Sequence, residues 1–157
     1  MVNGAFQGDM TMIARLLITG LLIGGASLAY AQNDPIAQRK ETMKTLGGFW
    51  YGDVAKMMKG EAPFDAAKVK AALDQMVLSS KTMPTLFPDT AKTGGDTKAL
   101  PTIWEKKDDF NQRWGRMGEE ATAALASIKD EASLKAAQPG LNKNCSECHT
   151  VYRAKAN

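Results

Sequence analysis

The chain has very few of the residues that ordinarily bind transition metals. Its 157 residues include two cysteines and one histidine, and all three lie in the last thirteen positions, as Cys145, Cys148 and His149. A structural zinc site ordinarily takes four nitrogen or sulfur ligands, so this inventory argues against one. Once His149 is used as a ligand, no second histidine is left for acid–base catalysis. The sequence therefore gives no support for a zinc protein or for an enzyme that depends on a histidine base.

Other patterns are missing as well. No segment shows the period-two alternation of a β-strand, and no internal repeat is visible. The formal net charge is only +3, and no basic run is interleaved with aromatic residues. A nucleic-acid partner is therefore not expected.

One apolar run stands near the N-terminus. It spans residues 16–28, follows Arg15 and ends at Ala29-Tyr30-Ala31, with small residues at the positions that a signal peptidase reads. We therefore predict that residues 1–31 are a cleaved secretory signal peptide and that residues 32–157 form the mature domain. The run is short for a membrane span, so stable membrane insertion after cleavage is not expected. An uncleaved N-terminal anchor is the alternative.

The last part of the chain contains the motif Cys145-Ser146-Glu147-Cys148-His149. The pattern C-x-x-C-H is typical of covalent haem c attachment, in which two thiols form thioether bonds and the imidazole reaches the iron. On a helix, residues three and four apart project to the same side. We predict that Cys145 and Cys148 attach one haem c and that His149 is an iron ligand. A plain disulfide is the alternative, but it leaves the position of His149 unexplained.

Hydrophobic period and helix-ending residues predict four helices, so the fold class is all-α, an antiparallel four-helix bundle. A long irregular segment from Pro84 to Pro101 is expected to pack over another part of the fold. Pro139-Gly140 predicts a kink or a short break in the last helix. The predicted helices run from Pro35 to Gly60, from Asp65 to just before Pro84, from Ile103 to about Ser127, and from near Asp130 to near Lys155.

Apolar residues recur at helical spacing within these segments. Met43 is in phase with this stripe, and Gly47, which has no side chain, would allow a cofactor to approach the first helix. The three tryptophans, Trp50, Trp104 and Trp114, are expected to be core and loop-packing residues. The stripe of the first helix is Ile36, Met43, Leu46, Trp50, Val54 and Met57, and that of the second is Ala66, Val69, Leu73, Met76 and Ser80.

Taken together, these features resemble the class II c-type cytochromes, the cytochrome c′ family, which carry C-x-x-C-H on the last helix of a four-helix bundle. The resemblance covers the whole mature chain. It implies a periplasmic protein that is not an enzyme, and it implies that Arg39 meets a haem propionate. It rests on Arg39-Lys40, Ala62-Pro63-Phe64-Asp65-Ala66-Ala67, Gly94-Gly95-Asp96, Ile103-Trp104 and Cys148-His149-Thr150-Val151-Tyr152-Arg153.

The resemblance also raises the question of the sixth iron ligand. In the low-spin branch a methionine occupies this position, one helical turn after the arginine, and here that residue is Met43. This implies an electron carrier with His149 and Met43 as axial ligands and with periplasmic redox proteins as partners. The alternative is a five-coordinate, high-spin cytochrome c′ that binds nitric oxide or carbon monoxide. The resemblance also allows a homodimer.

Overall fold

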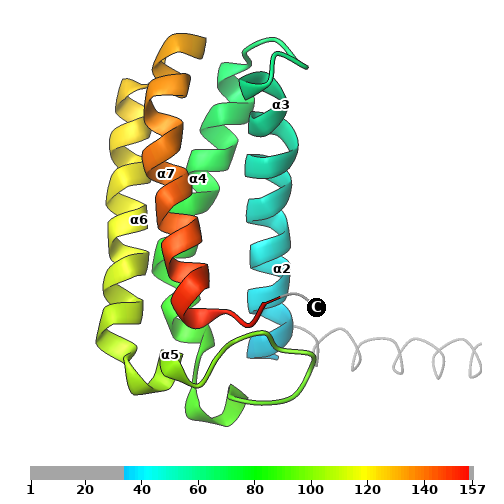
Figure 1. The fold of residues 1–157 in the computed structure, drawn as a ribbon, viewed down its shortest axis with the longest axis vertical. Coiled ribbons are helices and arrows are strands. Elements are labelled where there is room, and N and C mark those ends of the chain that lie inside the picture. Colours follow the sequence, from blue (N-terminus) through cyan, green and yellow to red (C-terminus); the bar gives the residue numbers. More distant parts are fainter. Residues whose placement is uncertain (1–33, 156–157) are drawn as a thin grey trace, which may run out of the picture. The chain divides into compact units, whose positions relative to one another are not determined.

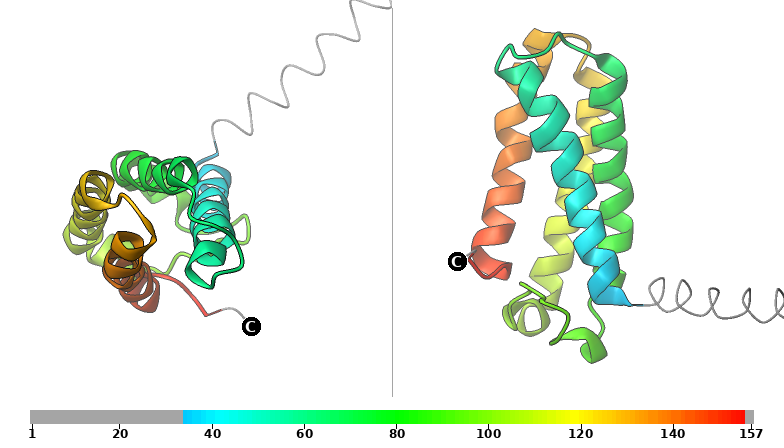
Figure 2. Two further views of the ribbon diagram at one scale, coloured as in Figure 1. Left: turned by 90° about the horizontal axis from the view of Figure 1, so that it is seen from above. Right: turned by 90° about the vertical axis from the view of Figure 1, so that its right-hand side faces the viewer.

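The computed structural model describes residues 34–155, and residues 35–155 form one bundle of four long helices (Figure 1). The all-α, antiparallel prediction is confirmed (Figure 2). The predicted signal peptide, residues 1–31, lies outside the described residues. None of the described helices has the length and apolar character needed to cross a membrane.

The first long helix has three consecutive segments. It comprises α2 (Pro35–Gly47), the π-helical segment η1 (Gly48–Val54) and α3 (Ala55–Met58). Proline at the first position suits a helix start, because the N–H that it lacks would have no helical partner there. The chain leaves the helix at Gly60, whose φ of 72° is favourable for glycine. The predicted bounds hold, but the wider π-helical turn was not predicted.

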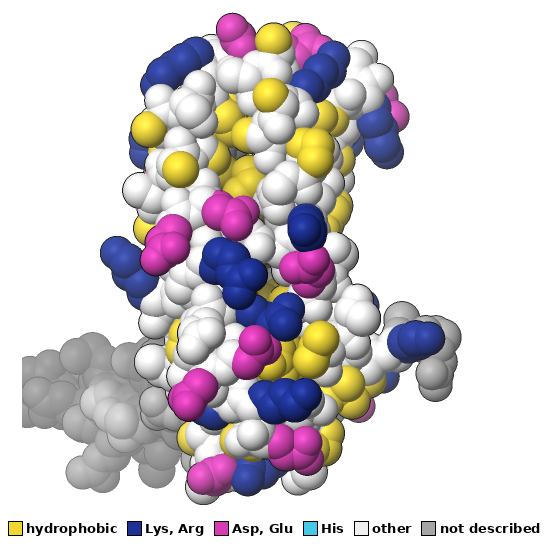
Figure 3. Space-filling model, turned by 60° about the vertical axis from the view of Figure 1, so that its left-hand side comes forward, with side chains coloured by type: hydrophobic (Ala, Val, Ile, Leu, Met, Phe, Trp, Pro, Cys, Tyr) yellow, Lys and Arg dark blue, Asp and Glu magenta, His cyan; other side chains and the backbone are white. Residues whose placement is uncertain are grey.

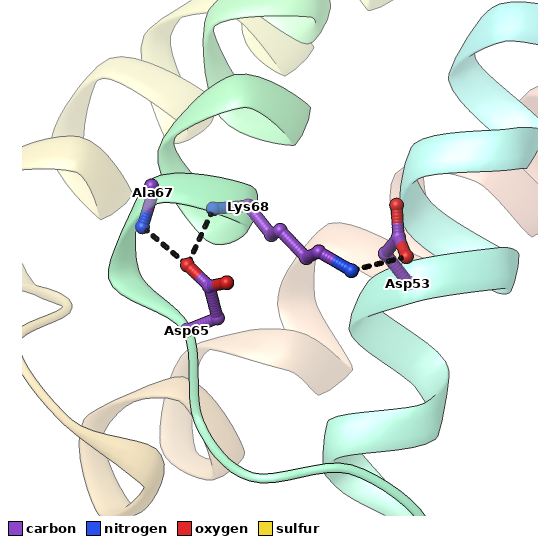
Figure 4. A network of polar contacts seen from close by, with 4 residues as sticks. All are labelled: Asp53, Asp65, Ala67 and Lys68. Atoms are coloured by element: carbon purple, nitrogen blue, oxygen red, sulfur yellow. Dashed lines mark hydrogen bonds and ion pairs between the residues drawn. The ribbon is translucent and has the colours of Figure 1, made fainter.

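The second long helix, α4 (Ala66–Thr82), begins at a well-formed cap. The Asp65 carboxylate accepts hydrogen bonds from the backbone N–H groups of Ala67 and Lys68, at 2.9 and 3.1 Å (Figure 4). The Lys68 ammonium group then pairs with Asp53 of η1 at 3.1 Å. The first two long helices are thereby joined at this end of the bundle. Of the predicted inward-facing residues of α4, Ala66 is exposed.

The connection after α4 is mostly irregular, as predicted, but it contains two short 3-10 turns, η2 (Met83–Leu86) and η3 (Asp89–Ala91). Its far end pairs with the C-terminal end of the chain. The N–H of Leu100 donates to the Tyr152 carbonyl at 3.0 Å, and the N–H of Ala154 donates to the Lys98 carbonyl at 2.8 Å. The connection therefore covers one end of the bundle.

The third predicted helix is divided. A short α5 (Thr102–Glu105) is separated from α6 (Lys107–Ser127) by Lys106, whose φ and ψ of −123° and 47° are not helical. The prediction of one unbroken helix from Ile103 was therefore wrong at this residue. Apolar period alone does not reveal such a break, because the residues on both sides keep the same inward phase.

The last helix, α7 (Glu131–Tyr152), starts with a capping box between Asp130 and Ser133. It runs without interruption through Pro139, so the predicted short break was wrong, whereas the predicted kink stays a prediction. Pro139 has no N–H group to donate to the carbonyl of Lys135, one turn earlier in the helix. Both residues are exposed, so water can reach that side of the helix. The cost of the missing hydrogen bond is thereby reduced. The helix ends before Lys155 because Arg153 is extended and bridges to Ala99.

The core runs along the bundle axis between these helices. Large buried residues come from every long helix, including Trp50, Leu73, Phe110 and Leu134. α4 and α6 approach closely at Gly118, where an added Cβ would lie 2.8 Å from the Cβ of Ser80. Outside the core, basic and acidic side chains are interspersed on the face that Figure 3 shows. Pairs such as Lys135–Glu131 and Lys143–Glu147 on α7 place opposite charges one helical turn apart.

Candidate haem-binding site

The C-terminal half of α7 carries the three motif residues. Cys145, Cys148 and His149 are all half-buried, and the two cysteines are free thiols. Cys148 and His149 line both of two neighbouring cavities, whereas Cys145 lines only the smaller one. The smaller cavity has a volume of about 90 Å³ and the larger one about 480 Å³. The helical spacing predicted from the sequence therefore brings all three groups to one hollow region of the bundle.

Burial keeps these groups uncharged. It raises the pKa of the Cys148 thiol to about 11, and it also raises the pKa of Cys145. Thioether sulfurs carry no charge, so covalent attachment suits the same apolar surroundings. The pKa of His149 is lowered, mainly by burial and secondarily by the positive charge of Arg153. At neutral pH the imidazole is therefore neutral and can offer a nitrogen lone pair to a metal.

The opposite wall comes from the first long helix. Met43 and Gly47 of α2 and Tyr51 of η1 line both cavities. A Cβ added to Gly47 would meet nothing within 4 Å, so the cavity is open at that point. Met43 is half-buried and packs on the edge of the core. Met43 and His149 therefore face the same space from two different helices. Coordination by Met43 stays a prediction.

Arg39 also lines the larger cavity, but its guanidinium group holds the connection after α4. The side chain is buried, with 4% of its surface exposed. Nη1 donates to the Leu86 carbonyl at 3.3 Å, and Nη2 donates to the Ala91 carbonyl at 2.9 Å and to Thr97 Oγ1 at 2.8 Å. The group also stacks on the Phe87 ring, 4.7 Å from its centroid. This structural role was not predicted, and the propionate contact stays a prediction.

The lining has the composition that a covalently bound haem requires. Two thiols and one imidazole lie on one wall, and most other lining residues are apolar. The larger volume lies in the range of about 300–1,000 Å³ that is typical of ligand cavities. The larger cavity is also lined by the basic residues Arg39, Lys40, Lys98 and Arg153, which suit the two carboxylates of a haem.

Two alternatives lose support from the same geometry. Within residues 34–155, no three histidine, cysteine or acidic side chains gather as a metal-ion site, which argues against zinc. The two cysteines are not joined in a disulfide. The residues fit haem c.

Comparison with known proteins agrees with this geometry. Residues 34–153 match the family model described as Cytochrome C′. The chain belongs to the cytochrome c′ family. Members of this family are non-enzymatic haem proteins, and their cofactor is a covalently attached haem c. In this chain the C-x-x-C-H motif near the C-terminus is consistent with that cofactor.

Relatives in this family carry more than one name. The chain is 49% identical over 138 residues to cytochrome c′ of Rhodopseudomonas palustris, covering 88% of this chain and 94% of that protein. It is 38% identical over 144 residues to cytochrome c-556 of Agrobacterium fabrum, covering 91% of this chain and 94% of that protein. A solved structure of cytochrome c′ from Rhodopseudomonas palustris superposes with a TM-score of 0.76 at 48% identity, covering 80% of this chain and 99% of that one.

Several cavity residues were not predicted from the sequence. Tyr51, Arg113 and Trp114 all line the smaller cavity, and Tyr51 and Trp114 also line the larger one. The pKa of Tyr51 is raised by burial and by the neighbouring Cys145 thiol. The sequence predicted that Trp114 is a core or loop-packing residue, but it did not distinguish a core position from a cavity wall, because both face inward.

Proposed function

We propose that this protein is a periplasmic monohaem cytochrome that carries electrons, with His149 and Met43 as the two axial ligands. The observation that carries the proposal is the position of Met43, which shares both cavities with His149 although the two residues lie on different helices. A thioether on one wall and an imidazole on the other are the donor pair of a low-spin c-type haem. Cys145 and Cys148 would hold the cofactor covalently between Met43 and His149.

The ligand set supports electron transfer rather than catalysis. With Met43 and His149 in both axial positions, no coordination site remains for a substrate. Methionine opposite histidine raises the reduction potential relative to two nitrogen ligands. Apolar residues such as Met76 and Met117 line the smaller cavity, and they would limit the access of water to a bound haem. The chain would thus set the potential and present the haem to its partners.

A second candidate function is a five-coordinate, high-spin cytochrome c′ that binds nitric oxide or carbon monoxide. A specific observation favours it. The relative at 49% identity is named cytochrome c′, whereas the relative named c-556 is 38% identical. By name and identity, the comparisons support this candidate better than the carrier. Met43 would then be a packing residue at the edge of the core, where methionine often fills irregular space.

Export to the periplasm belongs to the same proposal. The apolar run at residues 16–28 and the small residues at 29–31 support a secretory signal. Membership of a family of c-type cytochromes agrees with export. The partners would be periplasmic redox proteins that meet the haem transiently.

The visible spectrum of the reduced holoprotein, with and without carbon monoxide, separates the two candidates. For a carrier, the wild type is low-spin and binds carbon monoxide slowly or weakly, and Met43→Ala becomes high-spin and binds it readily. The control is Met58→Ala, because Met58 packs on the core from the same long helix but lines neither cavity. A wild type that is already high-spin, with a spectrum unchanged by Met43→Ala, would establish the gas-binding function instead.

A further inference from the structure

The three tryptophans of the chain differ in what their indole N–H groups contact. Trp50 Nε1 donates to Asn142 Oδ1 at 2.6 Å. Trp104 Nε1 donates to the carbonyl groups of Phe87 and Pro88, at 3.1 and 3.3 Å. Trp114 Nε1 is buried and has no acceptor, and it is the one such side-chain nitrogen or oxygen found in the described part of the chain. Two indoles thus have a protein partner, and the third does not.

Trp114 is also the tryptophan that faces the cofactor position most fully. It lies on α6, has 5% of its surface exposed, and lines both cavities together with Cys148 and His149. Buried indole N–H groups usually have a hydrogen-bond partner, because an unpaired buried donor loses its contact with water without compensation. Its acceptor is therefore expected inside the cavity.

Within the described residues no acceptor lies within hydrogen-bond distance of Trp114 Nε1, although the oxygen-bearing side chains of Asp96, Thr97 and Asn144 are among the cavity linings. The sulfurs of methionine and cysteine accept hydrogen bonds only weakly. One nitrogen of His149 is assigned to the metal, and its Nδ1 lies 3.4 Å from Arg153 Nη1. An oxygen acceptor that enters with the cofactor would satisfy this N–H group. Carboxylates suit this cavity, because four of its lining residues are basic, Arg39, Lys40, Lys98 and Arg153, and one is acidic, Asp96.

We propose that Trp114 Nε1–H donates a hydrogen bond to an oxygen acceptor that the haem brings into the cavity. The acceptor is either a haem propionate carboxylate or a water molecule held against the cofactor. This role rests on the presence of haem, and it does not depend on whether Met43 is the sixth ligand. Trp114 is then a positioning residue, and a donor to a carboxylate also lowers the pKa of that carboxylate.

Ultraviolet resonance Raman spectroscopy of the holoprotein tests the hydrogen bond directly, because an indole band responds to the state of the N–H group. Subtracting the spectrum of Trp114→Phe from that of the wild type isolates the signal of Trp114, which should be that of a hydrogen-bonded indole. Trp50→Phe and Trp104→Phe give the reference signals of two indoles that have protein acceptors. If Trp114→Phe does not fold, the double variant Trp50→Phe/Trp104→Phe leaves Trp114 as the sole indole. An indole free of hydrogen bonding at Trp114 in either experiment would overturn the proposal.

The pH dependence of the reduction potential identifies the acceptor. If Trp114 donates to a propionate, Trp114→Phe raises the pKa of that propionate, because the carboxylate loses a hydrogen bond that favours its charged form. The reduction potential of the variant should then change with pH at a higher pH than that of the wild type. If the acceptor is a bound water, the Raman spectrum is still that of a bonded indole, but the pH dependence is the same in both proteins. The carbon monoxide experiment is independent of both readouts, so failure of either proposal leaves the other testable.

Discussion

Arg39 donates from Nη2 to the carbonyl oxygen of Ala91 at 2.9 Å, which ties the first long helix to the connection that follows the second. Its other bonds, to Leu86 and Thr97, reach two further points of the same connection. Phe87, on which the guanidinium group stacks, is buried in the core. One side chain therefore fixes the connection that forms part of the wall of the larger cavity.

Replacing this arginine should destabilise the holoprotein. Arg39→Gln leaves buried carbonyl groups with fewer donors, and we expect the free energy of unfolding to fall by about 2–3 kcal/mol. Guanidinium chloride titration of the two proteins measures the change. Lys44→Gln is the control, because Lys44 is exposed on the same helix, pairs with Glu41 at 3.6 Å and lines neither cavity. Equal losses in the two variants would contradict this role for Arg39.

The close contact between α4 and α6 gives a second prediction. Gly118→Ala places a methyl group 2.8 Å from the Cβ of Ser80, and overpacking of this kind costs about 1–3 kcal/mol. Gly115→Ala on the same helix meets nothing within 4 Å and should be neutral or stabilising. Thermal unfolding of both variants makes the comparison. A Gly118→Ala protein as stable as the Gly115→Ala protein would show that the helices separate at no cost.

The main features of the fold were predictable because they follow from local period. The four helices, their ends near Gly60 and Asp65, and the long irregular connection all follow from apolar spacing, capping residues and prolines. The interruption at Lys106 and the continuity through Pro139 were not predictable. Both depend on the surroundings of the backbone. Pro139 is exposed, so the missing hydrogen bond costs little in α7, and Lys106 adopts a non-helical conformation between α5 and α6.

The hydrogen bond between Tyr152 and Asp109 gives a pH-dependent prediction. Tyr152 is buried, and its hydroxyl group donates to Asp109 Oδ2. Burial first, and the hydrogen bond to Asp109 second, raise the pKa of Tyr152 to about 12. A group whose pKa is raised on folding contributes its full stability below its ordinary pKa of about 10, and loses it as the pH rises to 12.

Tyr152→Phe should therefore lower the free energy of unfolding by about 1–2 kcal/mol at neutral pH, where the hydrogen bond is intact. Between pH 10 and 12 the variant should lose less stability than the wild type, because it has no Tyr152 proton to release. Denaturant titrations at several alkaline pH values provide the test. Parallel loss of stability in the two proteins across this range would contradict the assignment.

The candidate site was predictable only in part. The motif residues Cys145, Cys148 and His149 are adjacent in sequence, so their shared wall follows from helical spacing. Met43 shares the cavity with them across the bundle, and its assignment came from resemblance rather than from the residues alone. The bonds of Arg39 to residues 47 to 58 positions away, and the unpaired Trp114 N–H, depend on tertiary packing that no local pattern encodes.

Covalent attachment of the haem is tested by intact mass spectrometry of the denatured protein, purified from cells with a working haem-attachment system. We predict one haem that stays bound under denaturing conditions, on the peptide that contains Cys145 and Cys148, and a polypeptide that starts at Gln32. Replacement of both cysteines by serine should abolish the covalent mass. A mass equal to the bare polypeptide, from wild-type protein made in such cells, would contradict covalent haem attachment.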